Sequence, residues 1–184
     1  MVIAGAFTSL LAMPGMRERR VKIGSAGKMF SLTGWKIGLV CAAPPLMNAA
    51  LKAHQFLTFT TPPNLQRAVA YGLGKEESYF SALRNRFQHG RDRLSAGLES
   101  IGFAPLASEG TYFLGVDLQQ SGIPMTDKDF CLTLVKEFGI ASIPFSAFYA
   151  ADPVTNVVRL CFAKSDETLD NALEKLAKAK AALR

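Results

Sequence analysis

Residues 75–101 carry the pattern of one long helix. Apolar positions recur there at close to helical spacing, among many charged side chains, as on a helix with one buried stripe. This stripe consists of Phe80, Leu83, Phe87, Leu94 and Leu98. Gly102 suits the C-terminal cap, because glycine readily adopts the left-handed conformation that often ends a helix. We therefore predict a single helix that ends at about residue 101.

Strand and helix patterns alternate after this helix. Strands are predicted at "TYFLGVDL" (111–118), "IASIP" (140–144) and "NVVRLCFA" (156–163). A helix between the first two opens at Thr126 or Asp127 and closes at Gly139. Ser165 caps the last helix, with two acidic residues in its positive first turn. This order predicts an α+β unit with helices on a small sheet.

The segments before the long helix have a different character. Residues 18–25 predict a short strand, and residues 35–43 form a near-continuous apolar run, as in a buried strand of a parallel sheet. Helices are predicted at 45–57, where Pro44 and Pro45 suit the start of a helix, and at 65–73. Two buried strands cannot by themselves form a sheet covered on both faces. This section is therefore expected to be incomplete.

The predicted division of the chain falls just before the long helix. Residues 1–74 would form the end of an α/β domain, and residues 75–184 the long helix with the α+β unit. The first thirteen residues are apolar, but they lack a basic n-region and are too short to span a bilayer. We predict that they belong to the fold interior, and no membrane partner is expected.

Composition favours a folded protein from a reducing compartment. Among the 184 residues, 49% are hydrophobic and 20% are charged, a composition typical of a folded chain and not of a disordered one. Cys41, Cys131 and Cys161 are isolated, show no metal-ligand spacing, and suit the cytoplasm better than a disulfide framework. The formal charge of +6 leaves RNA or DNA binding open. The basic residues are scattered, however, so a solvated surface is favoured and no nucleic acid is expected.

The stretch "GSAGKMFSLTGWKIG", residues 24–38, is the strongest candidate for chemistry. It is not a Walker-type P-loop, because Lys22 stands where the early glycine belongs and Met29 follows Lys28. Pyridoxal phosphate requires a lysine amine to react with its aldehyde, together with hydroxyl, backbone N–H and cationic groups around its phosphate. Ser25, Lys28 and Lys36 supply such groups within twelve residues. By chemistry alone, a solvated lysine in a glycine-rich turn stays the commoner alternative.

The sequence of this stretch resembles the cofactor-lysine signature of class I/II, fold-type I, aminotransferases. The similarity is greatest to the kynurenine/glutamine and succinyldiaminopimelate aminotransferases, and it extends from about residue 14 onward. The other matching segments are "AHQFLTFTTPPNLQRAVA", "RDRLSAGLESIGF", "EGTYFLGVDL", "IASIPFSAFY" and "VVRLCFAKSDETLDNALEKL". The resemblance implies an α/β fold: the end of the large cofactor-binding domain, with part of its parallel sheet, followed by an α+β small C-terminal domain.

The resemblance also implies roles for the residues of the loop. Lys28 resembles the catalytic lysine that binds pyridoxal phosphate, and Ser25 the serine that contacts the phosphate. Lys36 stands where many members have a phosphate-binding arginine. Lysine keeps the positive charge but lacks the bidentate fork of arginine, so a weaker hold on the phosphate is expected.

Arg159 resembles the arginine that binds the substrate α-carboxylate. Independently of the resemblance, strand alternation places Arg159 on one face with Val157 and Cys161, in an apolar setting where a guanidinium needs a partner. The alternative is an edge-strand arginine that reaches water or an internal Asp. Phe59 and Thr60 resemble residues that reach the active site of the other subunit, with helix-end packing as their alternative.

Taken together, the resemblance implies an aminotransferase that moves an amino group between an amino acid and a 2-oxo acid. In relatives, the groups that hold the cofactor ring precede the lysine, and the 27 residues before Lys28 contain no Asp, Asn or Tyr. We therefore expect the C-terminal half of such an enzyme, acting as a homo-oligomer or with a missing N-terminal half. The alternative is a non-catalytic remnant that serves as a dimerisation or interaction module. No metal is expected.

Overall fold

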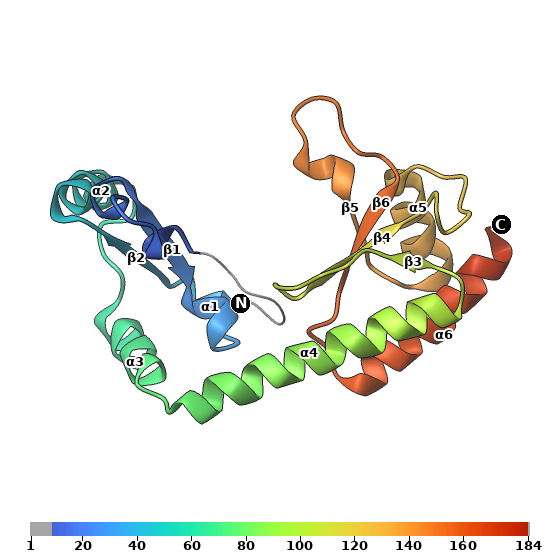
Figure 1. Cartoon of the computed structure of the whole chain (residues 1–184), viewed down its shortest axis with the longest axis horizontal. Helices are drawn as coiled ribbons and strands as arrows, with labels where there is room; N and C mark the ends of the chain where they lie inside the picture. Colours follow the sequence, from blue (N-terminus) through green and yellow to red (C-terminus); the bar gives the residue numbers. More distant parts are fainter. Residues whose placement is uncertain (1–8, 184) are drawn as a thin grey trace. The chain divides into compact units, whose positions relative to one another are not determined.

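The computed structural model describes residues 9–183, which divide into two compact units (Figure 1). The first unit ends at Phe80 and the second begins at Ser81, so the boundary falls inside α4 (Glu77–Ser100). The sequence pattern placed the domain division slightly earlier, between residues 74 and 75.

The first unit is built on a two-stranded antiparallel sheet. β1 (Val21–Ser25) pairs with β2 (Gly38–Ala42), and the connection between them contains α1 (Ala26–Met29) and the 3-10 turn η3 (Thr33–Trp35). The predicted parallel sheet is therefore wrong for the described residues, where every strand pairing is antiparallel. The physical reason is that the connection turns back on itself: the N–H of Ala26 donates to the Ile37 carbonyl, and the only α-helix in the described connection is the four-residue α1. Parallel neighbours instead need a crossover, usually a longer helix that packs on the sheet.

Helices and turns complete this unit. They are the 3-10 turns η1 (Leu10–Ala12) and η2 (Arg17–Arg19), and the helices α2 (Pro44–Leu57) and α3 (Pro63–Leu73). Prolines occupy the first turns of α2 and α3, where a missing N–H costs no helical bond. The core is small, with Ala26, Ile37 and Val69 at its centre.

Several apolar side chains of the first unit are exposed, contrary to the sequence prediction. Val40 of β2 is 45% exposed, although the apolar run had indicated a buried strand. Leu10 and Met13 are also exposed, so the predicted burial of the N-terminal segment is wrong for its described part, and residues 1–8 lie outside the described residues. Hydrophobicity alone predicted burial here, whereas β2 is paired on one edge only within the described chain.

The second unit is an antiparallel sheet with helices. Its strands are β3 (Ala104–Pro105), β4 (Phe113–Asp117), β5 (Ile143–Pro144) and β6 (Val157–Cys161), in the order β3-β4-β6-β5. The helical elements are α5 (Asp127–Thr133), its π-helical continuation η4 (Leu134–Phe138), the 3-10 turn η5 (Phe145–Phe148) and α6 (Asp166–Ala182). The expected α+β arrangement of this part of the chain is observed.

One continuous core holds the second unit together. Leu98 of α4, Leu114 of β4, Phe130 of α5 and Phe162 after β6 are almost fully buried in it. The register of β4 and β6, with Leu114 opposite Leu160, directs alternate side chains to this core. Burial of these residues fixes β6, and therefore the position of Arg159 on it.

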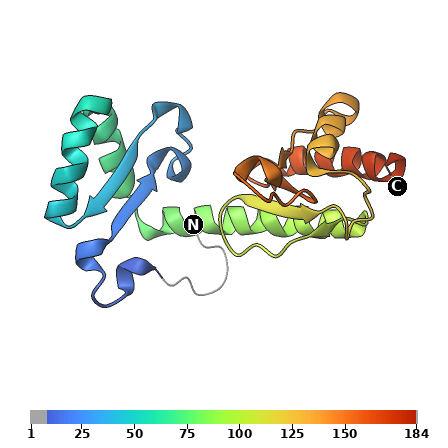
Figure 2. The ribbon, with the colours of Figure 1, turned by 90° about the horizontal axis from the view of Figure 1, so that it is seen from above.

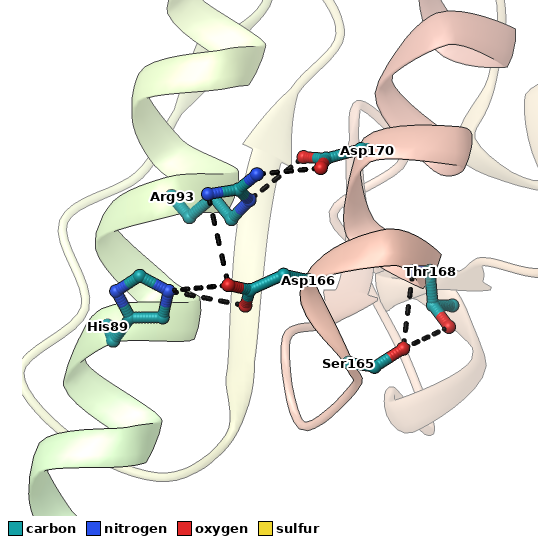
Figure 3. A network of polar contacts seen from close by, with 6 residues as sticks. All are labelled: His89, Arg93, Ser165, Asp166, Thr168 and Asp170. Atoms are coloured by element: carbon teal, nitrogen blue, oxygen red, sulfur yellow. Dashed lines mark hydrogen bonds and ion pairs between the residues drawn. The ribbon is translucent and has the colours of Figure 1, made fainter.

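Side chains also connect α4 to the beginning of α6, which lie side by side in Figures 1 and 2. Figure 3 shows the contacts: His89 and Arg93 of α4 meet Asp166 and Asp170 of α6. Ser165 caps α6 by accepting a hydrogen bond from the backbone N–H of Thr168, as the sequence predicted. The two helices are thus fixed to each other at their exposed side as well as through the core.

Candidate functional site

Lys28 lies in a connection that closes on itself. The backbone N–H of Ala26 donates to the Ile37 carbonyl at 3.1 Å, and that of Leu32 donates to the Gly27 carbonyl at 3.0 Å. The first bond joins the start and the end of the segment between β1 and β2, and the second closes the turn that follows α1. The exposed side chain of Lys28 therefore projects from a backbone that hydrogen bonds constrain on both sides.

Close packing further restricts this backbone. Gly27 is buried, and a Cβ atom built on it would lie 2.9 Å from the Cα of Thr33. A side chain at position 27 would force the turn that follows α1 to move. The glycine next to Lys28 therefore serves close approach between two backbone segments.

Ser25 and Lys36 lie at the two ends of the same connection. Ser25 is the last residue of β1, and its partner across the sheet is Gly38. Lys36 precedes this partner by two residues, and both Ser25 and Lys36 are exposed. Lys36 has left-handed backbone angles (φ 54°, ψ 41°), which are uncommon for a residue other than glycine. The three residues predicted to contact the cofactor thus lie in one hairpin, with Ser25 at the end of β1, Lys28 in α1 and Lys36 two residues before β2.

Phe59 has an unusual backbone conformation just after α2. Its φ of 63° lies in the left-handed region, where a bulky residue is a true outlier, and its side chain is 78% exposed. The N–H of Phe59 donates to the His54 carbonyl at 3.2 Å, and the N–H of Thr60 donates to the Thr58 carbonyl at 2.8 Å. An exposed aromatic residue in a strained conformation is a recurrent feature of functional segments.

Phe59 and Thr60 both border a hollow of about 410 Å³ inside the first unit. The other residues around it include Ile37, Leu39, His54, Thr61, Gln66 and Leu73. Ile37 follows Lys36 directly in the chain, so this hollow adjoins the end of the connection between β1 and β2, residues 26–37, which we call the lysine loop. Helix-end packing was the alternative that the sequence left open for Phe59, and a residue that is 78% exposed does not fit it.

Arg159 lies in the second unit, in the middle of β6, between Gly115 of β4 and Ile143 of β5. Its guanidinium carbon lies 3.8 Å from the centroid of the Phe113 ring and 4.8 Å from that of Phe148. Both rings attract a cation, so they hold the guanidinium between them.

The buried Nε of Arg159 has no hydrogen-bond partner among the described residues. No carboxylate of residues 9–183 forms an ion pair with its guanidinium, which excludes an internal Asp within that range. A buried donor without an acceptor is unfavourable, and an arginine fork matches a planar carboxylate.

Sequence reasoning did not single out Phe113 and Phe148. A signal for Phe113 was present in the "TYF" strand, which pairs with the strand that carries Arg159. In this pairing Phe113 lies opposite Cys161, two residues along β6 from Arg159. Phe148 lies in a 3-10 turn, where periodicity gives no information about which way a side chain points.

Metal sites and membrane spans have no support in the described part of the chain. Among residues 9–183, no group of three or more His, Cys, Asp or Glu side chains is arranged to hold a metal ion. Within the same range, no helix is both long and apolar enough to cross a bilayer.

Comparison with known proteins gives the family. The profile of the family described as "Aminotransferase class I and II" matches residues 4–176. The chain belongs to the class I and II aminotransferases. Members of this family typically use pyridoxal phosphate.

Relatives within the family include enzymes with several named substrates. The solved N-succinyldiaminopimelate aminotransferase from Mycobacterium tuberculosis superimposes with a TM-score of 0.91 and 41% identity, over 97% of this chain and 47% of its own. The methionine aminotransferase of Escherichia coli is 41% identical over 169 residues, covering 91% of this chain and 43% of the relative. Human kynurenine–oxoglutarate transaminase 1 is 34% identical over 195 residues, covering 95% and 46%. The chain thus spans less than half the length of these relatives.

Proposed function

We propose that this chain supplies the lysine-bearing part of an aminotransferase active site. The reaction would move an amino group between an amino acid and a 2-oxo acid. Because the chain matches less than half of each relative's length, the remaining groups of the site would come from a second polypeptide or from a further part of the protein.

The observation that carries this proposal is the environment of Arg159. Its guanidinium is held between two aromatic rings, with a buried Nε that has no acceptor in residues 9–183. An amino acid and a 2-oxo acid both carry an α-carboxylate, and a carboxylate would supply the missing acceptor. The aromatic rings restrict the guanidinium to one orientation, so little conformational freedom would be lost on binding.

The lysine loop fits the cofactor that the family uses. Lys28 offers the amine that would hold pyridoxal phosphate covalently, Ser25 a hydroxyl, and Lys36 a positive charge for the phosphate. When bound, the cofactor supplies an electron sink for negative charge at the substrate α-carbon. The amine of Lys28 would then take up and return the proton at that carbon.

The exposed surface of the first unit supports a requirement for a partner. Ile23, Phe56 and Leu57 are each about four-fifths exposed or more, at 79%, 86% and 82%. Exposed apolar side chains on a two-stranded sheet and a neighbouring helix are typical of a surface that another chain covers. We propose a homo-oligomer or a pairing with the missing N-terminal half, in which Phe59 and Thr60 would contribute to the partner's active site.

Covalent trapping tests the role of Lys28. The chain is incubated with excess pyridoxal phosphate, reduced with borohydride, digested, and mapped by mass spectrometry. We expect the pyridoxyl group on Lys28, with the label lost in Lys28→Arg. Lys22→Arg is the matched control, because Lys22 is an exposed lysine on the adjoining strand, outside the connection. Labelling elsewhere, or none at all, would refute the assignment.

A non-catalytic interaction module is the second candidate, favoured by the exposed apolar residues of the first unit. Sedimentation with and without pyridoxal phosphate separates the two functions. If the chain self-associates to the same extent with and without the cofactor, and Lys28 is not labelled, the interaction module would be favoured.

A further inference from the structure

Phe113 and Phe148 contact Arg159 from elements that are held in place in different ways. Phe113 belongs to β4, and its backbone is fixed by the ladder that pairs it with Cys161 of β6. Phe148 ends the four-residue turn η5, outside the ladder, and its side chain is 60% exposed. Within the turn, the Phe148 ring has an edge contact with Phe145, with the ring centroids 6.4 Å apart. This contact lies inside η5, so the hydrogen bonds that fix the turn also help to keep the ring against Arg159.

Asp127 provides these hydrogen bonds. Its Oδ2 accepts from the backbone N–H of Ser146 at 2.7 Å, and its Oδ1 accepts from the Ser146 hydroxyl at 3.0 Å. Oδ1 also accepts from the backbone N–H of Lys128 at 2.9 Å. Both carboxylate oxygens are thus used, and two of the three bonds go to the turn that carries Phe148.

The burial of Asp127 indicates that this contact has a specific role. The residue is fully buried, and no ion pair involves it within residues 9–183. A buried carboxylate without a cation is unfavourable unless hydrogen bonds compensate for its lost hydration. Capping of α5 alone therefore does not explain why a carboxylate is buried at position 127. Thr126 already caps this helix by accepting from the N–H of Asp129.

We propose that Asp127 and Ser146 are positioning residues that hold Phe148 against Arg159 and thereby fix the direction of its guanidinium. The effect runs from the α5 terminus through η5 to the ring, and from the ring to the arginine. This inference rests on the proposed carboxylate-binding role of Arg159 for its functional meaning. Neither Asp127 nor Ser146 touches the substrate in this scheme.

The test observes the Nε–Hε resonance of Arg159 by 15N-edited NMR in the 184-residue chain, assigned with Arg159→Lys. Ring currents from both phenyl rings should displace this resonance, and Phe148→Leu gives its position without the second ring. We expect Ser146→Ala and Asp127→Asn to move it toward the Phe148→Leu position. Exchange of this proton with solvent should accelerate about tenfold or more, a factor that corresponds to about 1.4 kcal/mol.

Two matched controls isolate the contact. Asp129→Asn removes another carboxylate from the same helical turn, and Ser142→Ala removes a hydroxyl that donates to Cys131 Sγ instead. Both should leave the Arg159 resonance in place. If Asp127→Asn does not fold, Ser146→Ala decides the question, since it keeps the carboxylate. An unmoved resonance in folded Ser146→Ala and Asp127→Asn would overturn the proposal.

Addition of 2-oxoglutarate separates this inference from the proposed function. A displaced Arg159 resonance in the wild-type chain supports carboxylate binding. If 2-oxoglutarate has no effect while the variants still move the resonance, the carboxylate role fails and the positioning role stands. If 2-oxoglutarate displaces the resonance but the variants do not, the positioning role fails alone.

Discussion

Arg93 donates two hydrogen bonds to Asp170, from Nε at 2.8 Å and from Nη2 at 2.6 Å, and this bidentate pair joins α4 to α6 (Figure 3). The guanidinium lowers the pKa of Asp170 below its ordinary value of 3.8, mainly through the hydrogen bonds. The same contact raises the pKa of Arg93. Since both side chains are partly exposed, solvent screens the pair, and its contribution to stability is expected to be small.

The pair predicts a specific dependence of stability on pH. Because the folded-state pKa of Asp170 is lowered, its contribution is present above the ordinary value and is lost as pH falls through the folded value. We expect Asp170→Asn to lower the Tm at pH 7. The difference in Tm between this variant and the wild type should shrink as the pH falls below about 4. Glu174→Gln, an exposed change on the same helix, should show no such gap. A gap that persists at low pH would contradict the prediction.

Two glycines of α4 should respond differently to alanine. A Cβ at Gly90 would lie 2.7 Å from the backbone oxygen of Phe162, which cannot move without shifting the end of β6. At Gly97 the obstacle is the end of the Leu173 side chain, which can rotate. We expect Gly90→Ala to destabilise the protein by about 1–3 kcal/mol, despite the higher helix propensity of alanine.

Gly97→Ala is the control in the same helix, and it should cost clearly less. Urea unfolding of both variants measures the difference. Equal stabilities of Gly90→Ala and Gly97→Ala would mean that the backbone at the end of β6 shifts as easily as the Leu173 side chain rotates.

The cysteines should differ in reactivity. Cys41 is exposed, whereas Cys131 is buried and burial raises the pKa of its thiol, against a smaller opposing effect of the hydrogen bond from Ser142. At pH 8 we expect iodoacetamide to modify Cys41 about tenfold faster than Cys131, or more, because the thiolate is the reactive form. Peptide mapping over time follows each site, and Cys41→Ser should abolish the fast phase. Denaturant should equalise the rates; modification of Cys131 first would contradict the structure.

Replacement of Arg159 should affect both substrates of an active assembly. In a preparation that transaminates, Arg159→Ala should lower kcat/KM by at least ~10²-fold for the amino donor and for the oxo acid, because each carries the α-carboxylate. Arg159→Lys should recover only part of the loss, since lysine lacks the bidentate fork. Arg93→Ala is the control, as its guanidinium is already paired with Asp170. An effect on one substrate alone would argue for a different role.

The 184 residues alone should not transaminate efficiently. The segment before Lys28 contains no Asp, Asn or Tyr, the types that hold the cofactor ring in relatives. With saturating pyridoxal phosphate, we expect turnover well below ~1 s⁻¹ for methionine, glutamine, kynurenine and succinyldiaminopimelate with 2-oxoglutarate or pyruvate. The full-length Mycobacterium tuberculosis relative serves as the positive control. Turnover near ~1 s⁻¹ or above would refute the prediction.

Local signals predicted the helices well. Thr126 and Ser165 accept hydrogen bonds at the starts of α5 and α6, and Gly102 and Gly139 adopt the left-handed conformation after α4 and η4, as their positions in the sequence indicated. Such caps depend on a few neighbouring residues, so the sequence contains all the information they require.

Features that depend on distant partners were not predictable in the same way. The burial of β2 depends on what covers it, and the apolar run at residues 35–43 could not show that Val40 is exposed. The position of Phe148 against Arg159 depends on Asp127, which is nineteen residues before Ser146 and whose sequence context indicates only a helix start. The roles assigned to Lys28 and Arg159 stay predictions, since they concern ligands.

The pairing of α4 with α6 has a consequence for synthesis on the ribosome. Arg93 and Asp170 are separated by 77 positions, and α6 also supplies Leu169 and Leu176 to the core. The core of the second unit therefore cannot be completed until α6 has left the exit tunnel, because these contacts span most of the unit's length. Until then the side of α4 that packs against α6 stays uncovered, and this part of the nascent chain is exposed to chaperones and to misassembly.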